Sequence, residues 1–400
     1  MNNLFEGVKV MLMLFAVFLP KHSEVSGISS KSMRTVCPLV VNFPVSEYSA
    51  PAIKPVNGNE KFVIVQIGDS HIQAGFNTSE TRENVAAFMG EKFLSAGFVF
   101  PYDVCHTNSP ALYSFSSEGD WNYNKITIDP NSINAGLAGI VLSTADALAT
   151  LTVRQNPTDG FESSFDKVNV FYNGTFSECV PVIKHPQVES SIYQDGMATF
   201  TFAKAEEEVT IGIENLANNA EFHITGMVLS NSKSKFTFHS AGLNGASFHS
   251  YLRALNFGTD LSKLNPNLVI VSLGTNDAYN TGFSPQGFEK DLDSLVQIIK
   301  RSAPLADILL TTPNDHFING AVPNERTAKV VSIIKDYASA NGCLVWDFYS
   351  AMGGVGSIAQ WNKRGLSAPD LIHFSKSGYR LQGQLLSAYL TSGICYKVDF

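Results

Sequence analysis

The chain has 400 residues, of which 44% are hydrophobic and 16% are charged, and its formal net charge is −8. This composition is typical of an ordered globular protein with a large core and excludes an intrinsically disordered chain. No segment is dense in lysine and arginine, which argues against a nucleic-acid partner. A small or carbohydrate-like partner fits better, and the length allows two or three domains.

Residues 1–27 are predicted to be a secretory signal peptide. Lys9 precedes an apolar run over residues 10–19, which is too short to span a bilayer and is followed by Pro20. Glu6 makes the leading segment less basic than is usual for such signals. No later segment resembles a transmembrane helix, so the sequence predicts export to the periplasm or the medium, with no stable membrane span after the signal is removed.

Five cysteines are widely spread along the chain: Cys37, Cys105, Cys179, Cys343 and Cys395. None of them forms a C-x-x-C pair, so neither a zinc site nor a redox motif is expected. An exported chain permits one or two disulfides. Buried free thiols are an equally good interpretation for any one of them.

The first regular elements are predicted after residue 60. Residues 28–60 contain several prolines and little periodicity, and we expect an exposed lead-in. An apolar run over 62–67 is followed by a glycine, an aspartate and Ser70, as expected of a buried strand that presents a serine at its carboxyl end. Helical spacing of apolar residues predicts a helix over 81–96. A strand followed by a helix is the first half of an α/β unit, which we assign to residues 61–105.

Residues 106–236 are predicted to form an inserted β-sandwich of the jelly-roll kind. Short alternating runs separated by Gly, Pro, Asn and Asp are typical of antiparallel strands, and no long helical pattern interrupts them. The clearest runs are 125–128, 167–172, 198–202, 208–213 and 222–229. Aromatic residues in this region could offer a stacking platform for sugars, although packing in the sandwich core explains them as well: Trp121, Tyr123, Phe171 and Tyr172.

An alternation of strands and helices returns in residues 237–400. Apolar strands are predicted over 267–273, 307–312 and 343–348, and helices with one apolar face are predicted near 288–299, 325–340 and 381–389. This alternation predicts a three-layer α/β fold, in which a parallel sheet carries helices on both faces. In such sheets, ligands bind at the carboxyl ends of the strands.

Residue types that serine acyl chemistry requires occur at or near such strand ends. A serine hydroxyl needs a base to take its proton, and the base needs an orienting group on its far nitrogen. Ser70 follows the first strand, and a turn can place the side chains of Asp370 and His373 on one side of a single loop. Donors aimed at the reacting carbonyl oxygen contribute about 3 kcal/mol each. The candidates are the backbone N–H groups of Ser70 and Gly245 and the side-chain amide of Asn276.

Four segments together resemble the conserved blocks of the SGNH, or GDSL-type, hydrolase family: Ile67-Gly68-Asp69-Ser70, Gly242-Leu243-Asn244-Gly245-Ala246-Ser247, Gly274-Thr275-Asn276-Asp277 and Asp370-Leu371-Ile372-His373. The resemblance covers roughly 61–105 and 237–395. It implies an SGNH, flavodoxin-like fold with Ser70 as nucleophile and first oxyanion donor. It also implies Gly245 and Asn276 as further donors, Asp370 as orienting group and His373 as base.

Two features of the sequence bear on this resemblance: one indicates a branch of the family, and the other gives a second candidate for the oxyanion glycine. His71 replaces the leucine of the commoner GDSL form, and together with the inserted β-region it is similar to the peptidoglycan O-acetylesterase branch, which removes acetyl groups from muramic acid. Gly242 is an alternative to Gly245 as the oxyanion glycine. We prefer Gly245 because the small residue two places on, Ser247, matches the glycine block of the family.

Three further residues are candidates for substrate contact. His71 adjoins the predicted nucleophile, but the base position is already filled, so it shapes the pocket or forms a local hydrogen bond. His316 follows the third strand of the second half, where a loop histidine without contact to substrate is the simpler interpretation. Trp361 precedes the loop of Asp370 and either walls the acyl pocket or packs in the core.

The sequence therefore predicts an exported serine esterase that removes O-acetyl groups from a polysaccharide, with peptidoglycan favoured and an acyl-serine intermediate. It predicts no cofactor and no metal. An acetylxylan or other glycan O-acetylesterase is the first alternative. The second alternative belongs to another class, a carbohydrate-binding protein whose hydrolase-like part is a scaffold without activity.

Overall fold

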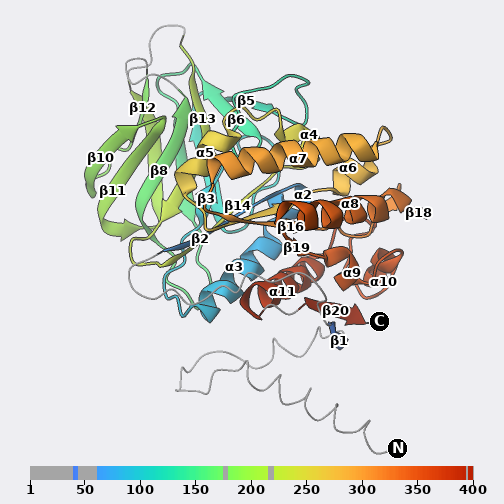
Figure 1. Cartoon of the computed structure of the whole chain (residues 1–400). Helices are drawn as coiled ribbons and strands as arrows, with labels where there is room; N and C mark the ends of the chain where they lie inside the picture. The colour runs from blue at the N-terminus through green and yellow to red at the C-terminus, as the bar shows by residue number, and fades with distance from the viewer. Residues whose placement is uncertain (1–38, 44–60, 174–178, 215–219, 393–394, 400) are drawn as a thin grey trace, which may run out of the picture. The chain divides into compact units, whose positions relative to one another are not determined.

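The computed structural model describes residues 39–43, 61–173, 179–214, 220–392 and 395–399 (Figure 1). The predicted signal peptide and most of the predicted lead-in lie outside these residues. The chain from Leu39 to Phe400 forms one compact unit. Within it, strand β1 (Leu39–Phe43) pairs antiparallel with strand β20 (Cys395–Asp399) near the end of the chain.

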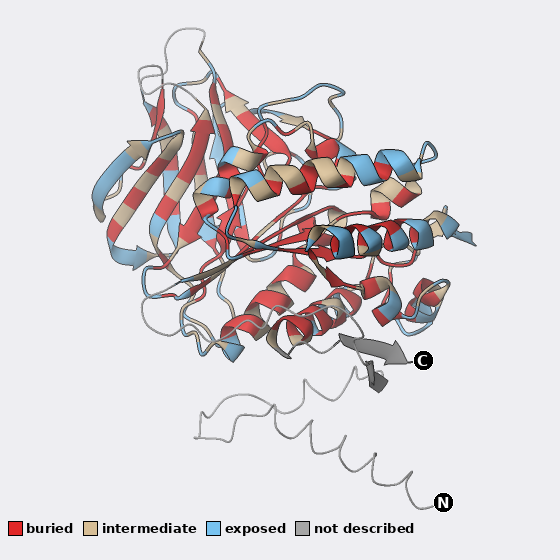
Figure 2. Cartoon of the chain, in the orientation of Figure 1, coloured by how far each residue is buried: buried red, intermediate tan, exposed pale blue. Residues whose placement is uncertain are grey.

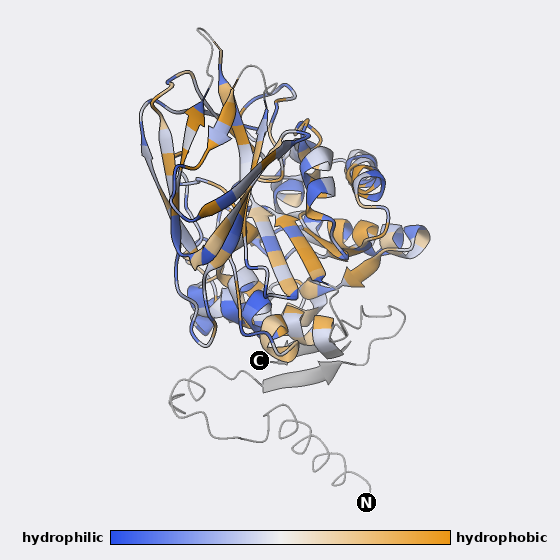
Figure 3. Ribbon diagram, turned by 90° about the vertical axis from the view of Figure 1, so that its left-hand side faces the viewer, coloured by the Kyte–Doolittle hydropathy of each residue, from blue (hydrophilic) through white to orange (hydrophobic). Residues whose placement is uncertain are grey.

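A five-stranded parallel sheet forms the centre of this unit. Its strands, in spatial order, are β14 (Phe236–Gly242), β2 (Phe62–Gly68), β15 (Leu268–Ser272), β16 (Asp307–Thr311) and β19 (Leu344–Trp346). The central strands are almost entirely hydrophobic, as expected when both faces of a parallel sheet are covered (Figure 3). Because all five strands run in one direction, their carboxyl ends meet at one edge.

Alternate residues of each central strand contribute to two different hydrophobic cores. In β2, Val65 and Ile67 join the first core and Ile64 joins the second, and β15 repeats the pattern with Val269 and Ile270. These residues are buried almost completely (Figure 2). The sheet therefore has two apolar faces, each of which needs a covering layer.

Helices cover both faces of the sheet. The first core contains side chains from α4 (Phe248–Tyr251), α5 (Phe257–Leu264), α7 (Pro285–Ser302) and α8 (Glu325–Asn341). The second core contains side chains from α3 (Phe76–Phe88), α9 (Phe348–Met352), α10 (Ser357–Lys363) and α11 (Lys376–Ser392). The short helices α2 (Ser70–Gln73) and α6 (Thr275–Tyr279) follow β2 and β15 at the carboxyl edge of the sheet.

An antiparallel region occupies the chain between α3 and β14 and contains two sheets. One has the order β10 (Val188–Gln194), β11 (Met197–Glu206), β8 (Phe165–Asn173), β13 (Phe222–Ser230), β6 (Ile140–Thr144) and β5 (Asn122–Lys125), with β3 (Gly97–Val99) also paired to β13. The other has the order β4 (Tyr113–Glu118), β7 (Thr150–Gln155), β12 (Glu208–Glu214) and β9 (Val180–Val182). A small hairpin of β17 (Phe317–Ile318) and β18 (Val322–Pro323) lies elsewhere, before α8.

The antiparallel region shares its core with the parallel sheet. Buried residues from both antiparallel sheets, such as Leu151 in β7 and Val170 in β8, belong to the same hydrophobic cluster as Val65 of β2 and Leu261 of α5. The Asp260–Lys263 pair on α5 also lies at this junction, where Lys263 Nζ donates to Gly196 O at 3.2 Å. The two regions are therefore joined by packing as well as by the chain.

The predicted fold class is confirmed, with two differences in its elements. The helix predicted over 81–96 runs from Phe76 to Phe88, because Gly75 in the left-handed conformation (φ 77°) starts it earlier. Phe93, which the periodicity placed on that helix, lies instead in a bridge to Glu162. The edge strand β14 was not predicted, since His239 and Ser240 interrupt its apolar pattern.

Three findings concern membrane-spanning helices, metal sites and the cysteines. In the part of the chain that the structure describes, no helix has the length and hydropathy needed to cross a membrane. The same residues contain no group of three or more His, Cys, Asp and Glu side chains placed to hold a metal ion. Cys105 and Cys343 are buried free thiols, and burial raises the pKa of Cys105 to about 12.

Candidate active site

Ser70 lies where β2 ends and α2 begins. Asp69 is the N-cap of this short helix, and its Oδ1 accepts a hydrogen bond from the backbone N–H of His71 at 2.9 Å. Gly68 permits the abrupt change of direction, because a Cβ atom there would lie 2.3 Å from Ile72 Cγ1 and 2.7 Å from Ser272 O. The strand thus delivers the Ser70 hydroxyl to the carboxyl edge of the sheet.

The loop before α11 brings His373 to this hydroxyl. Ser70 Oγ lies 2.9 Å from His373 Nε2, and His373 Nδ1 lies 2.7 Å from Asp370 Oδ2. Since a carboxylate accepts and does not donate, Nδ1 carries the proton and Nε2 is free to accept from the serine. Ser70 and His373 lie 303 residues apart in the sequence, and together with Asp370 they form one hydrogen-bonded series.

The Asp370 carboxylate is fixed by its own loop. Its Oδ1 accepts from the backbone N–H groups of Ile372 and His373, both at 2.9 Å. Leu371 adopts a left-handed conformation (φ 55°), which bends the chain so that both N–H groups point at one oxygen. Partial burial alone would raise the pKa of Asp370, but the hydrogen bonds from His373 and Ile372 outweigh it and lower that pKa.

A cavity of about 590 Å³ opens beside the serine and the histidine. Ser70, His373, Gly245 and Asn276 all line it. Gly245 has a positive φ of 79°, and the Asn276 side-chain amide donates to Ala246 O at 2.9 Å, which connects α6 to the glycine loop. The predicted donors and the predicted nucleophile therefore face one space.

Gly242 has a different surrounding from Gly245. A Cβ atom on Gly242 would lie 2.4 Å from Gln73 N and 2.7 Å from Asp69 O, so this glycine allows β14 to approach the backbone of α2 closely. It does not line the cavity, whereas Gly245 does. The placement favours Gly245 over Gly242 as the residue that faces a bound acyl group.

Two carboxylates with raised pKa values, Asp69, which is buried, and Asp277, which is half-buried, lie next to the predicted site residues. Burial raises the pKa of Asp69, which precedes Ser70, to about 7. Burial also raises the pKa of Asp277, which follows Asn276, to about 7. The oxygens of Asp277 lie 3.2 and 3.4 Å from the backbone N of Phe248, so this carboxylate joins α6 to the start of α4.

Comparison with known proteins agrees with this arrangement. The GDSL-like Lipase/Acylhydrolase family matches residues 220–381, which include the glycine block, the Asn276 block and the loop of His373. None of the curated proteins is similar enough to the sequence to match.

Solved structures extend the likeness beyond the family match. A peptidoglycan O-acetylesterase is 25% identical, with a TM-score of 0.70, and the likeness covers 83% of this chain and 91% of that one. A lipase/acylhydrolase from Enterococcus faecalis is 24% identical over 42% of this chain and 80% of that one, with a TM-score of 0.33. An acetyl xylan esterase is 20% identical over 38% and 79%, with a TM-score of 0.31, too low to bear on the substrate. The protein is a carboxylic ester hydrolase.

In this hydrolase, His71 lies behind His373 rather than in the cavity. Its side chain is buried, its ring centroid is 5.2 Å from that of His373, and its Nδ1 lies 3.2 Å from the Tyr379 hydroxyl. Burial lowers the pKa of His71 well below the usual range, so the ring is neutral. Its position allows it to support the ring of His373 but gives it no surface toward a substrate.

The predicted substrate contacts of His316 and Trp361 do not fit their placement, because both side chains are fully buried. His316 Nδ1 donates to Asn314 O at 3.1 Å, and Nε2 accepts from Asn324 Nδ2 at 2.8 Å. Burial lowers the pKa of His316 to about 4. Trp361 Nε1 donates to Met352 O at 3.0 Å, and its ring packs on Phe374 in the second core.

Several residues of the site were not found from the sequence. The cavity is also lined by Ala74, Asn108, Asn244, Thr275, Tyr279, Ile372 and Tyr379. Gln73, which is buried, accepts from the backbone N–H of Asn244 at 2.6 Å and donates to Asn108 O at 2.8 Å. It thereby holds the glycine loop against the segment that leads into the antiparallel region. A polar residue three places after the serine on α2 was the only signal available for it.

Proposed function

We propose that this hydrolase is an exported serine esterase that removes O-acetyl groups from peptidoglycan. The observation that carries the proposal is the hydrogen-bonded series Ser70, His373 and Asp370 beside a cavity that Gly245 and Asn276 also line. The likeness to a peptidoglycan O-acetylesterase along most of both chains supports the choice of substrate. The predicted signal peptide supports export.

In the proposed reaction, His373 Nε2 takes the proton of Ser70 as Oγ attacks the carbonyl carbon of the acetyl ester. Asp370 holds Nδ1–H and stabilises the imidazolium that forms. The Ser70 and Gly245 backbone N–H groups and the Asn276 amide donate to the oxyanion. Collapse of the tetrahedral intermediate breaks the bond to the sugar oxygen, which receives the proton from His373.

The second half of the reaction repeats these roles with water. A water molecule attacks the carbonyl carbon of the acetyl-serine, and His373 takes a proton from this water molecule. The second tetrahedral intermediate uses the same donors, and the bond to Ser70 Oγ breaks. Acetate leaves and the serine regains its proton from His373. The two halves of the reaction together consume one ester and one water molecule and need no other reactant.

The decisive experiment measures acetate release from O-acetylated peptidoglycan and from acetylxylan by the wild-type enzyme and by Ser70→Ala. We expect faster release from peptidoglycan, and a loss of about 10⁴- to 10⁶-fold in kcat for the variant. Ser117→Ala, which changes an exposed serine on β4, is the matched control and should retain activity.

Each outcome of this experiment has a distinct meaning. Substantial activity in a folded Ser70→Ala protein would remove Ser70 as nucleophile and with it the proposed mechanism. Faster release from acetylxylan would keep the mechanism and replace the substrate. Binding of either glycan by the wild-type protein without acetate release would favour the non-catalytic alternative. Recovery of the activity from the cytoplasm alone would contradict export.

A further inference from the structure

A second cavity of about 510 Å³ adjoins the catalytic one. Gly245, Asn276 and Tyr279 line both cavities, so the second begins at the predicted oxyanion donors. Its other walls come from α4 and the loop after it, from the start of α7, and from Thr127 in the antiparallel region. A substrate whose ester lies at Ser70 can therefore extend into this space without leaving the enzyme.

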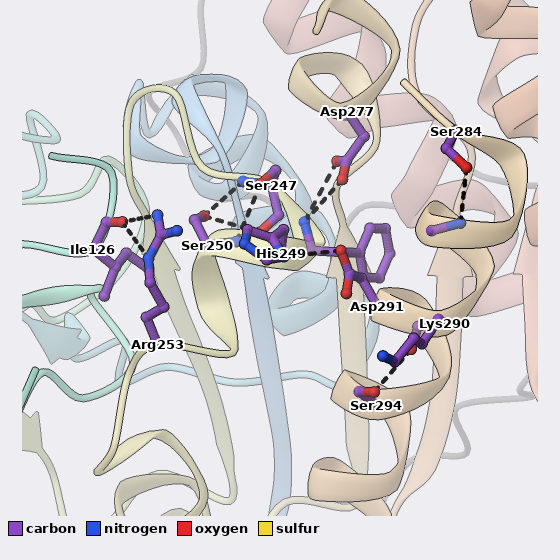
Figure 4. A network of polar contacts seen from close by, with 12 residues as sticks. Ile126, Ser247, His249, Ser250, Arg253, Asp277, Ser284, Lys290, Asp291 and Ser294 are labelled. Atoms are coloured by element: carbon purple, nitrogen blue, oxygen red, sulfur yellow. Dashed lines mark hydrogen bonds and ion pairs between the residues drawn. The ribbon is translucent and has the colours of Figure 1, made fainter. Parts of the chain in front are cut away.

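Most charged groups around the second cavity already have partners (Figure 4). His249 Nδ1 lies 3.0 Å from Asp291 Oδ2, and Asp277 accepts from the backbone of Phe248. Ser247 and Ser250 form a reciprocal capping box at the start of α4. These groups shape the wall and leave little unpaired charge for a ligand.

Arg253 is the exception. Its Nε and Nη2 both donate to the backbone carbonyl of Ile126, which orients the guanidinium across the boundary between the two regions (Figure 4). Among the described residues, Nη1 has no hydrogen-bond acceptor and no carboxylate lies within ion-pair distance of Arg253. Hydrogen bonds from Asn131 and Asn124, and then the charge of Arg253, lower the pKa of Asp129, but the two residues form no ion pair.

We propose that the second cavity binds a carboxylate-bearing peptide attached to the acetylated glycan, with Arg253 as the partner of the carboxylate. The inference rests on the proposed function. A guanidinium that is held in place by two of its donors and keeps another free is suited to a carboxylate, because little side-chain entropy is lost when the ligand binds. A neutral sugar chain such as xylan would give this charge no counter-ion.

The chemistry of peptidoglycan supplies the required ligand. Muramic acid carries a short peptide with free carboxylates on the same sugar that bears the acetyl ester. With that ester at Ser70, the sugar lies at the mouth of the catalytic cavity and its peptide can enter the neighbouring one. Phe283 and Phe288 in the wall of the second cavity offer apolar contact to the aliphatic parts of such a peptide.

The test uses two substrates of similar size, of which only one carries charged carboxylates on its peptide. One is an O-acetylated disaccharide-peptide, and the other is the same compound with its peptide carboxylates converted to methylamides. We expect wild-type enzyme to prefer the charged form in kcat/KM by roughly 5- to 30-fold, the range for a charge-assisted hydrogen bond at a partly exposed site. The preference should shrink as ionic strength rises.

Variants assign this preference to one side chain. In Arg253→Gln, the ratio of the two kcat/KM values should fall to about one, and Arg253→Lys should keep part of it because the charge remains. The matched control is Arg154→Gln, which removes an arginine from the surface of β7 far along the antiparallel region and should keep the wild-type ratio.

The ratio separates recognition from stability. If Arg253→Gln lowers both values equally, Arg253 only supports the wall, and the inference is wrong. A wild-type ratio near one also overturns it. If wild-type enzyme hydrolyses an aryl acetate but neither disaccharide-peptide, the proposed substrate itself is wrong and this inference falls with it. That outcome differs visibly from the first two, in which acetate is released.

Discussion

The antiparallel region has ion pairs that are exposed to solvent, whereas two carboxylates of the parallel-sheet region, beside the predicted site residues, are largely removed from solvent. Arg154–Glu208 and Lys184–Glu214 are exposed pairs on the antiparallel sheets, at 3.7 and 3.0 Å. Asp69, in contrast, is buried and Asp277 is half-buried, and loss of solvation raises the pKa of each to about 7. Exposed pairs contribute little to stability, whereas buried carboxylates cost free energy when they ionise.

The direction of the strands explains why the site lies in one region only. Parallel strands bring all their carboxyl ends to one edge, so residues as distant as Ser70, Asn276 and the loop of His373 meet there. Antiparallel strands send successive ends to opposite edges, and their polar loop residues disperse. The antiparallel region accordingly contributes Asn108 and Thr127 to cavity walls, while the parallel region contributes the proposed reacting groups.

The largest expected effect concerns Asp370, the proposed orienting group of His373 in the parallel region. In Asp370→Asn, the new amide group would face His373 Nδ1, so that Nδ1 accepts and Nε2 keeps its proton. The histidine can then no longer accept from Ser70. We expect kcat on an aryl acetate to fall about 10³- to 10⁴-fold with the free energy of unfolding almost unchanged. If the variant instead loses stability and keeps its kcat, Asp370 mainly supports its loop.

The second prediction concerns a core residue of the antiparallel region, where we expect a substitution to lower stability and to leave the rate almost unchanged. Phe98 of β3 is buried, and its ring packs against Gly226 and near Phe171. Phe98→Ala should lower the free energy of unfolding by about 3 to 5 kcal/mol. Because this residue lines neither cavity, kcat of the folded variant should stay within a few-fold of wild type.

Urea unfolding checks this second prediction together with the shared core. We expect a single transition for wild type and for Phe98→Ala, since residues of both regions belong to one hydrophobic cluster. Two separate transitions would mean that the antiparallel region unfolds by itself. A large loss of kcat at full stability would assign this region a part in the chemistry and remove the contrast between the two regions.

The sequence predicted the main elements of the fold because their signals were local. Apolar runs and helical periodicity identified the central strands and the helices α7, α8 and α11. The start of α3 was missed because its contact with α11 is polar. There Asn77 Nδ2 donates to Gln382 Oε1 at 2.9 Å, and Gly383 allows the backbones to approach. The spacing of apolar residues cannot indicate a polar contact of this kind.

The same distinction separates the predicted site residues from the missed ones. Ser70, Asp370 and His373 lie in short segments whose residue types indicate serine acyl chemistry without any knowledge of the fold. The structure brings the three side chains together. Gln73 and Tyr379 depend on partners that only the fold supplies, namely the glycine loop and His71. No local pattern distinguishes such residues from ordinary helix residues.

The raised pKa of Asp277 leads to a prediction on pH. The pKa of Asp277 is about 7 in the folded protein and about 3.8 when unfolded, so the folded state binds more protons between these values. The stability that this carboxyl contributes is complete below about pH 4 and is lost as pH rises through 7. Asp277→Asn cannot ionise but keeps an oxygen for the Phe248 N–H.

We therefore expect the difference in free energy of unfolding, variant minus wild type, to increase by about 1.4 kcal/mol per pH unit from pH 4 to 7. Urea unfolding at pH 5 and pH 7 measures it. A difference that is independent of pH would mean that Asp277 is already ionised at pH 5. Asp277 would then behave like the exposed carboxylates of the antiparallel region.

The smallest expected effect tests the contrast within a single helix. Tyr379 and Tyr389 are both buried on α11, but the Tyr379 hydroxyl lies 3.2 Å from His71 Nδ1, whereas the Tyr389 hydroxyl donates to Val345 O at 2.9 Å in the core. Replacing either tyrosine with phenylalanine should cost about 1 kcal/mol in the free energy of unfolding.

Only Tyr379→Phe should also alter catalysis. The His71 ring packs beside His373 at 5.2 Å, so loss of its hydroxyl partner lets the imidazole of His373 deviate from Ser70. We expect kcat on an aryl acetate to fall several-fold, with Tyr389→Phe as the matched control at wild-type rate. Equal kcat values in the two variants would show that His71 fills space without positioning the base. Control of the His373 ring by its neighbours would then end at Asp370, and the parallel region would differ from the antiparallel one in its proposed reacting groups alone.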